Sequence, residues 1–278
     1  MHSSCTPRGP CPAFSRCARS DRVPQYAPAG YRTDKGREEF FRYQKGAIPV
    51  SGPETARLGE AARESQIFVV IGVIESDGGT LYCTALFFGP DGMLMGKHRK
   101  LMPTVAERLI WGCGDGSTLP VLDTGLGKIG AVICWENYMP VMRMAMYGKG
   151  INIHCAPTAD ARDTWLSTMQ HIALEGRCFV FSACQYITRG AYDKDYQCAL
   201  GNDPDTVVMR GNSVIISPMG KRLVEPCTTA ETILHAELDL DEIAHTKFEF
   251  DAVGHYARPD VFSLSVNEAP MGAVRFSK

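Results

Sequence analysis

The chain contains the run Ile129-Gly-Ala-Val-Ile-Cys134, followed directly by Trp135-Glu-Asn-Tyr-Met-Pro140. The apolar run predicts a buried β-strand that ends at Cys134, and the proline after the polar residues permits a helix to begin. A thiol at the end of a buried strand faces a turn, where a substrate can reach it. Cys134 is therefore a candidate nucleophile, although a cysteine in this context can also be a small core residue.

A basic cluster, Lys97-His-Arg-Lys100, lies upstream and stops shortly before Pro103. If Lys100 approaches Cys134 from a second strand, its ammonium would favour the thiolate and then stabilise charge that forms on the substrate. Glu107, seven residues past Lys100, could accept a hydrogen bond from the lysine or orient a water. Either residue could equally be a solvated surface residue. The residues alone leave a cysteine hydrolase without a histidine base as one hypothesis.

The composition is that of one large domain. The chain has 278 residues, of which 45% are hydrophobic, and this is enough to bury a substantial core. The net charge is -2 and the basic residues are dispersed, so no nucleic-acid partner is expected. No membrane partner is expected either, because no apolar run reaches the roughly 18 residues that span a bilayer. The 11 cysteines include no CxxC pair and no Cys/His grouping, which indicates a reduced, cytoplasmic chain without a metal site.

Turn residues and apolar periodicity divide the chain into helices and strands. Helical spacing predicts helices over Pro53–Ser65, Pro140–Tyr147 and Asp163–Gly176, and a helix or an entry loop over Gly36–Ala47. Strands are predicted over Ile67–Ile74, Thr80–Phe88, Ile151–Cys155, Phe179–Gln185, Asn212–Ser217 and Thr232–Leu238, with another after Pro90-Asp-Gly92. Strand pairs joined by helices indicate mixed sheets, and two sheets between helix layers would bury this many strands.

Several long motifs occur in a specific order along the chain. They are Arg99-Lys-Leu-Met-Pro-Thr104, Ile110-Trp-Gly-Cys-Gly-Asp-Gly-Ser117, Val132-Ile-Cys-Trp-Glu-Asn-Tyr-Met-Pro140, Cys155-Ala-Pro-Thr-Ala-Asp160, His171-Ile-Ala-Leu-Glu-Gly-Arg177 and Gly254-His-Tyr-Ala-Arg-Pro-Asp-Val261. From about Arg32 to Val266, the chain resembles a nitrilase. More narrowly, it resembles the true nitrilase and cyanide hydratase branch of the carbon–nitrogen hydrolase superfamily.

The resemblance implies an α/β fold, a four-layer α-β-β-α sandwich over residues 32–278, preceded by an atypical segment at 1–31. It also implies a homo-oligomer, either a dimer through the helical layers or a larger spiral. The implied reaction converts a small-molecule nitrile and water to a carboxylic acid and ammonia, with no cofactor and no metal.

The resemblance assigns a role to each matching residue. Cys134 would attack the nitrile carbon to form a thioimidate, and a thioester would follow. Lys100, with the backbone N–H of Trp135, would stabilise the developing negative nitrogen. Glu107 matches the family's second glutamate, which supports the lysine. Substrate-binding positions are implied at four residues: Trp135, Trp111, Thr158 and Trp165.

The chain departs from the family pattern at one catalytic position. The family's general base is a glutamate in a Pro-Glu-Ala-Phe-like segment that ends the first core strand. The matching stretch here is Cys11-Pro-Ala-Phe14, which places Pro12 at the glutamate position. Proline has no carboxylate, so the general base is expected to be missing. Residues 1–10 contain Cys, Pro, Ser and Arg in place of a Val/Ile-rich strand, so the fold is expected to be incomplete at its N-terminus. Three functions stay open: a nitrilase, a cyanide hydratase or amide hydrolase of the same superfamily, and an inactive member that serves as an assembly subunit.

Overall fold

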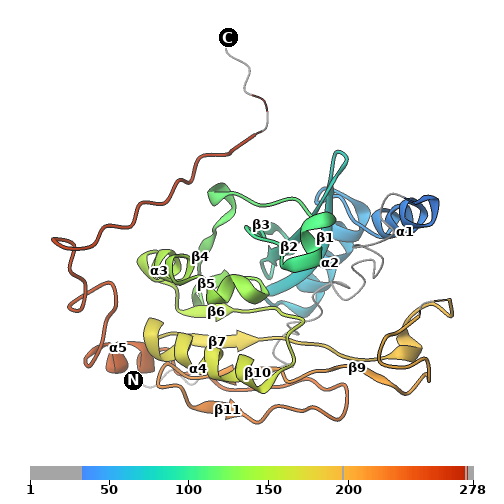
Figure 1. Ribbon diagram of the computed structural model, residues 1–278. Coiled ribbons are helices and arrows are strands. Elements are labelled where there is room, and N and C mark those ends of the chain that lie inside the picture. The colour runs from blue at the N-terminus through green and yellow to red at the C-terminus, as the bar shows by residue number, and fades with distance from the viewer. Residues whose placement is uncertain (1–32, 196, 273, 275–278) are drawn as a thin grey trace.

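The structure is a computed structural model that describes residues 33–195, 197–272 and 274. The predicted segment 1–31, with Pro12, lies outside these residues. The α-helices among them are α1 Asp34–Lys45, α2 Pro53–Ser65, α3 Pro140–Gly148, α4 Asp163–Gly176 and α5 Asp241–Lys247 (Figure 1). The three helices predicted from spacing are confirmed as α2, α3 and α4, and the segment at 36–47 is a helix. Pro53 and Pro140 each occupy the first helical turn, where a missing N–H costs nothing.

The first sheet is antiparallel, in the order β1-β2-β3, with bounds β1 Val69–Asp77, β2 Thr80–Phe88 and β3 Leu94–Arg99. The predicted turn at Asp77-Gly-Gly79 joins β1 to β2. Gly78 there has φ +58°, a left-handed conformation that favours glycine. The second sheet has the order β11-β10-β7-β6-β5-β4 and is mixed, because β5, β6 and β7 run parallel to one another. A two-stranded ribbon pairs β8 Tyr186–Thr188 with β9 Val207–Arg210.

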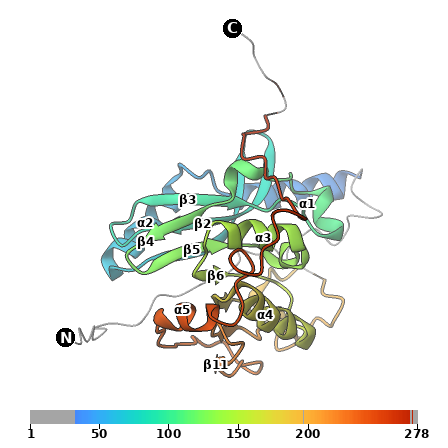
Figure 2. The same cartoon turned by 90° about the vertical axis from the view of Figure 1, so that its left-hand side faces the viewer.

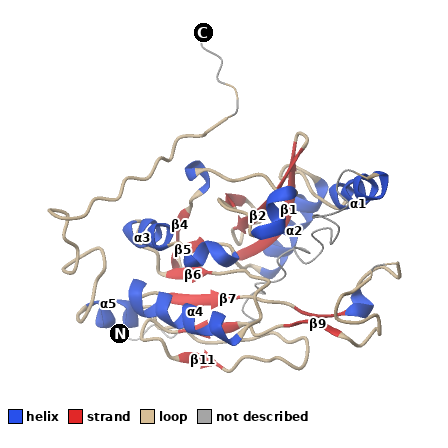
Figure 3. Cartoon of the chain, viewed as in Figure 1, coloured by secondary structure: helices blue, strands red, loops and turns tan. Residues whose placement is uncertain are grey.

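The strands of the second sheet are short. Their bounds are β4 Val121–Thr124, β5 Gly127–Ala131, β6 Ile153–Cys155, β7 Phe179–Ser182, β10 Val214–Ile216 and β11 Arg222–Val224. Figure 3 shows these strands beside the helices that cover them. Short parallel strands with helical crossovers bring their carboxyl ends to one edge of the sheet, where loops can carry functional groups.

The two sheets pack face to face and are covered on both outer sides by helices. Side chains of the first sheet, including Leu81 and Phe87, share one core with Ile129 and Ile153 of the second sheet. Ala62 of α2 packs on the outer face of the first sheet. On the other side, α3 and α4 cover the second sheet through two further clusters, which include Met146 and Trp165 (Figure 2). The layers confirm the predicted α-β-β-α sandwich.

Two predictions about strands need correction. Residues 232–238 form no strand, because they make no ladder with any strand of the described residues, and Ile233 is exposed. An apolar alternation becomes a strand only where an edge is available to pair with it. The strand expected to reach Cys134 ends at Ala131. The chain continues extended beside β6, since Val132 N–H donates to the Cys155 carbonyl at 2.9 Å and Cys134 N–H to that of Pro157 at 2.8 Å.

Candidate active site

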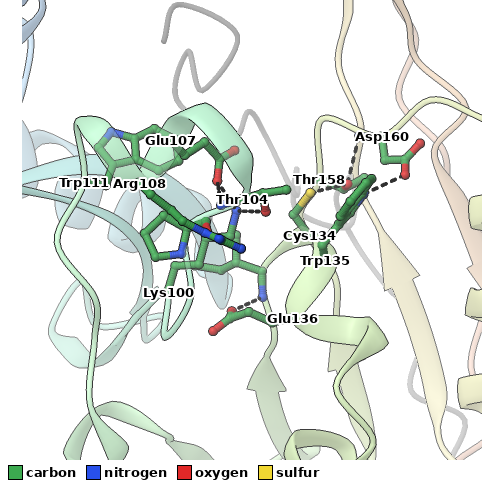
Figure 4. A network of polar contacts seen from close by, with 12 residues as sticks. Lys100, Thr104, Glu107, Arg108, Trp111, Cys134, Trp135, Glu136, Thr158 and Asp160 are labelled. Carbon is green, nitrogen blue, oxygen red and sulfur yellow. Dashed lines mark hydrogen bonds and ion pairs between the residues drawn. The ribbon is translucent and has the colours of Figure 1, made fainter. Parts of the chain in front are cut away.

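Lys100 follows β3 directly and is buried, with 1% of its surface exposed. Two hydrogen bonds fix its backbone. Its N–H donates to the carbonyl of Cys83 at 2.8 Å, and its carbonyl accepts from the N–H of Gly114 at 2.8 Å. The Nζ atom donates to Glu107 Oε2 at 2.6 Å and to Thr104 Oγ1 at 3.1 Å. The lysine therefore points inward, with its charge compensated by a carboxylate (Figure 4).

Glu107 is held in place by a turn of 3₁₀-helix, η2 Val105–Leu109. Its Oε2 atom also accepts the backbone N–H of Thr104 at 2.6 Å, which is one half of a capping box. Val105 has φ +47°, a conformation that is strained for a β-branched residue. The strained turn folds the carboxylate back over the lysine, so both charges form a single rigid unit.

The environment keeps Lys100 protonated. Burial alone lowers the pKa of its ammonium, but negative charge at Cys83 and Cys134 when they ionise, and the Glu107 carboxylate that accepts its hydrogen bond, outweigh that penalty, and the pKa is raised. A permanently charged ammonium can stabilise negative charge on a substrate atom at neutral pH.

Cys134 begins a second 3₁₀ turn, η4 Cys134–Tyr138, at the end of the extended chain that follows β5. Its φ is +52°, which is uncommon for a residue with a side chain and typical of strained functional turns. The hydroxyl of Thr158 donates to its sulfur at 3.2 Å. Figure 4 shows the Cys134 sulfur and Thr158 opposite the group formed by Lys100, Thr104 and Glu107.

The thiol is protonated at rest. Burial raises the pKa of Cys134, and the charge of Lys100 and the hydrogen bond from Thr158 lower it without fully offsetting the burial. Lys100 therefore favours the thiolate, as the sequence suggested, but does not by itself produce it.

A buried ion pair ties the cysteine turn to the lysine strand. Glu136, two residues past Cys134, accepts the N–H of Ile133 at 2.8 Å and that of Leu101 at 2.5 Å. Its Oε2 atom also bonds His98 Nε2 at 3.0 Å. Burial lowers the pKa of His98, but the charge of Glu136 and the hydrogen bonds to Glu136 and Thr118 leave that pKa raised. Both ring nitrogens face acceptors, Nε2 the Glu136 carboxylate and Nδ1 the Thr118 carbonyl at 2.5 Å, so both donate as in an imidazolium. One carboxylate thus spans the residues beside both Cys134 and Lys100.

Asn137 fixes the same turn from the other side. Its Nδ2 atom donates to the carbonyls of Val132 at 2.7 Å and Cys134 at 2.8 Å. Its Oδ1 atom then accepts from His154 Nε2 at 2.8 Å. Burial, followed by the charge of Arg143, lowers the pKa of His154 to about 4, so this ring is neutral. A neutral, buried histidine here is a packing and hydrogen-bonding residue, not a base.

Comparison with known proteins identifies the family of the chain. The model of the carbon-nitrogen hydrolase family matches residues 23–248. The chain belongs to the carbon-nitrogen hydrolase family. It is 62% identical to a nitrilase of Bradyrhizobium diazoefficiens, over 89% of this chain and 77% of the relative. The identity is 61% to an aliphatic nitrilase of Sinorhizobium fredii, covering 88% and 79% of the two chains. These identities place it in the nitrilase branch.

A plant relative and a solved structure extend the comparison. A bifunctional nitrilase/nitrile hydratase of Nicotiana tabacum is 55% identical over 89% of this chain and 72% of its own. The crystal structure of Saccharomyces cerevisiae Nit3, a member of branch 10 of the nitrilase superfamily, aligns with a TM-score of 0.62 at 23% identity, over 79% and 77% of the chains. At that identity the structure supports the fold alone, which is the same sandwich.

Three tryptophans of this carbon–nitrogen hydrolase were expected to contact substrate. Trp135 is partly exposed, and its Nε1 donates to Asp160 Oδ2 at 2.9 Å. Trp111 is buried, with its Nε1 donating to the Tyr43 hydroxyl at 3.0 Å and its ring 5.8 Å from Lys100 Nζ. Trp165 is fully buried in the α4 core and donates to Ser182 Oγ at 2.8 Å. Trp135 and Trp111 thus flank the site, whereas packing accounts for the contacts of Trp165; substrate contact stays a prediction for all three.

Sequence reasoning gave no role to several residues that build this site. Thr104 could have been found, because Thr104-Val-Ala-Glu107 has the spacing of a capping box, which places the carboxylate near the turn. Glu136, His98 and Asp160 also make contacts that no short-range pattern predicts. The contacts that join them across the site, from Glu136 to His98 and Leu101 and from Asp160 to Trp135, span 25 or more residues, so only the fold brings these groups together.

The described residues include no group of three or more His, Cys, Asp or Glu side chains arranged to hold a metal ion. Within the same residues, no helix has the length and apolar character needed to span a membrane.

Proposed function

We propose that Cys134, Lys100 and Glu107 carry out nitrilase-type hydrolysis of a carbon–nitrogen triple bond. The observation that carries the proposal is a buried, carboxylate-held ammonium whose charge acts on a thiol that begins a strained turn. Lys100 follows β3 of the first sheet and Cys134 follows β5 of the second, and Figure 4 shows their side chains on opposite sides of the site. This is the arrangement that nucleophilic addition to a polarised multiple bond requires.

The first step adds the thiol across the nitrile. The sulfur of Cys134 bonds to the nitrile carbon, one carbon–nitrogen π bond breaks, and the thiol proton ends on nitrogen, which gives a thioimidate. Negative charge develops on that nitrogen during the addition. The Lys100 ammonium stabilises it, while Glu107 holds the lysine in position.

Two waters complete the reaction. The first adds to the thioimidate carbon, and the tetrahedral intermediate expels ammonia to leave a thioester on Cys134. The second water hydrolyses the thioester, releases the carboxylic acid and returns the thiol. The substrate is a small nitrile, in keeping with the Sinorhizobium fredii relative named an aliphatic nitrilase.

A second activity follows from the same tetrahedral intermediate. If the carbon–sulfur bond breaks in place of the carbon–nitrogen bond, the product is an amide and the thiol is regenerated. The relative from Nicotiana tabacum, named a bifunctional nitrilase/nitrile hydratase, favours this branch as a minor route here.

The setting of the enzyme is part of the proposal. We place it in the cytoplasm as a homo-oligomer with residues 32–278 as the hydrolase domain. The eight cysteines of the described residues form no disulfide with one another, which fits a reducing compartment.

The experiment incubates the purified chain with aliphatic and aromatic nitriles and measures ammonia, acid and amide separately. Wild-type protein is expected to release ammonia and acid in equal amounts, with a smaller amount of amide. Cys134→Ala should release none, and Cys227→Ala, a matched cysteine variant outside the site, should behave as wild type. Equal product from wild type and Cys134→Ala would overturn the proposal.

A further inference from the structure

Thr158 lies where the chain leaves β6, and only 1% of its surface is exposed. Its hydroxyl donates to the Cys134 sulfur at 3.2 Å, within the range of a hydrogen bond to sulfur. The same oxygen accepts the backbone N–H of Asp160 at 2.9 Å. Because that N–H occupies the oxygen as an acceptor, the single hydroxyl proton is left to point at the sulfur.

The hydroxyl cannot easily turn away. The backbone N–H of Thr158 donates to the carbonyl of Ala183 at 3.0 Å, which fixes the main chain against the segment directly after β7. Asp160 is anchored in turn, since its carboxylate accepts from Trp135 Nε1 at 2.9 Å and from Arg162 Nε at 2.8 Å. The loop therefore presents a donor at a set position, which is the condition for stabilising charge without reorganisation.

The charged groups around Cys134 do not duplicate this donor. Lys100 directs its Nζ to Glu107 and Thr104, and the Glu107 carboxylate opposes a negative sulfur. Arg162 also acts on Cys134 through its charge, but its guanidinium is engaged with Asp160 and lies toward solvent. Among the described residues, the Thr158 hydroxyl is the side-chain donor to the sulfur, and the backbone of Ala159 supplies a second hydrogen bond to it.

We propose that Thr158 is a catalytic residue that stabilises the Cys134 thiolate through its hydroxyl, in place of the pocket-wall role expected from the sequence. The bond strengthens when the sulfur becomes negative, because hydrogen bonds to ions are stronger than those between neutral groups. It thus acts when the thiol ionises. Resting on the proposed function, it acts again when the thioester breaks and the sulfur leaves as thiolate.

The test measures ionisation of Cys134 directly, without a nitrile. Wild type and variants are treated with iodoacetamide from pH 5 to 11, and Cys134 modification is followed by peptide mapping. In Thr158→Val, which keeps the shape and removes the hydroxyl, the inflection should move to higher pH. Alkylation at pH 7 should fall about tenfold, the effect of one lost hydrogen bond to a charged group. Thr158→Ser should restore the wild-type profile.

Controls separate this role from a packing role. Thr168→Val, on α4, removes a hydroxyl that bonds only a helix carbonyl and should leave the profile unchanged. If Thr158→Val fails to fold, Thr158→Ala and Thr158→Ser are compared in its place, with circular dichroism as the check. An unchanged inflection in the folded variant without the hydroxyl, or a shifted one in Thr158→Ser, would overturn the proposal. Nitrile turnover is not part of the readout, so failure of the proposed function would show separately.

Discussion

The two halves of the active site are assembled in different ways. In the lysine half, Lys100, Thr104 and Glu107 come from one short segment and form a charged unit with local contacts. In the cysteine half, Cys134 has a raised pKa, and its sulfur accepts a hydrogen bond from Thr158, which lies in a different loop. The lysine half supplies fixed charge, and the cysteine half supplies a nucleophile whose position depends on the surrounding fold.

This difference predicts that substitutions in the two halves lower different properties of the protein. Loss of a charged group in the lysine half should lower the rate while the fold survives, because its contacts are local. Loss of a group that holds the cysteine turn should lower the stability of the whole protein, because those contacts join separate elements.

The largest effect is expected for Lys100→Met, which keeps the length of the side chain and removes its charge. Nitrile turnover should fall about 10³-fold, since the developing charge on nitrogen loses its main stabilising group. The measurement is kcat for ammonia release. Lys221→Met, at an exposed lysine, is the matched control and should retain wild-type kcat. A Lys100→Met enzyme within tenfold of wild type would mean that the lysine half does not supply the charge.

Glu136→Gln should act on stability. The change breaks a buried pair with His98, and such a break costs about 3 kcal/mol of unfolding free energy. Urea unfolding followed by circular dichroism measures it. Glu60→Gln, which breaks the exposed pair with Arg63 on α2, is the matched control and should leave the midpoint unchanged. If both variants unfold at the wild-type midpoint, the cysteine half does not depend on this pair.

A smaller effect is expected from pH. Burial lowers the pKa of His98, but the negative charge and hydrogen bond of Glu136 raise it by more. The pKa in the folded protein therefore lies above that in the unfolded protein. The pair's contribution is therefore fully present below the unfolded pKa, about 6.5, and is lost as pH rises through the raised, folded pKa. Unfolding free energies measured from pH 6 to 9 should show wild type losing stability relative to Glu136→Gln. Parallel curves for the two proteins would show that the imidazolium is not linked to folding.

The same contrast explains what the sequence could predict. The helices, most strands and the four layers follow from apolar periodicity, prolines and turn glycines, which act over a few residues. The Lys100–Glu107 pair could be predicted for the same reason, because the two residues are only seven positions apart. The contacts of Cys134 with Thr158, and of Glu136 with His98, depend on the parallel register of β5 and β6 and on how two sheets stack. The strand predicted at 232–238 was wrong for a related reason. A strand needs a neighbouring strand to pair with, and the local sequence does not show whether one is present.

The central claim is that the nitrile carbon bonds to the sulfur of Cys134. It can be tested by trapping the thioester intermediate. Wild-type protein is mixed with an excess of aliphatic nitrile, quenched in acid within milliseconds to seconds, and mapped by peptide mass spectrometry. The account predicts a single acyl adduct, on Cys134, that forms in step with ammonia release and decays in step with acid release, and none in Cys134→Ala. An adduct on a different cysteine, or acid formation by Cys134→Ala at the wild-type rate, would contradict it.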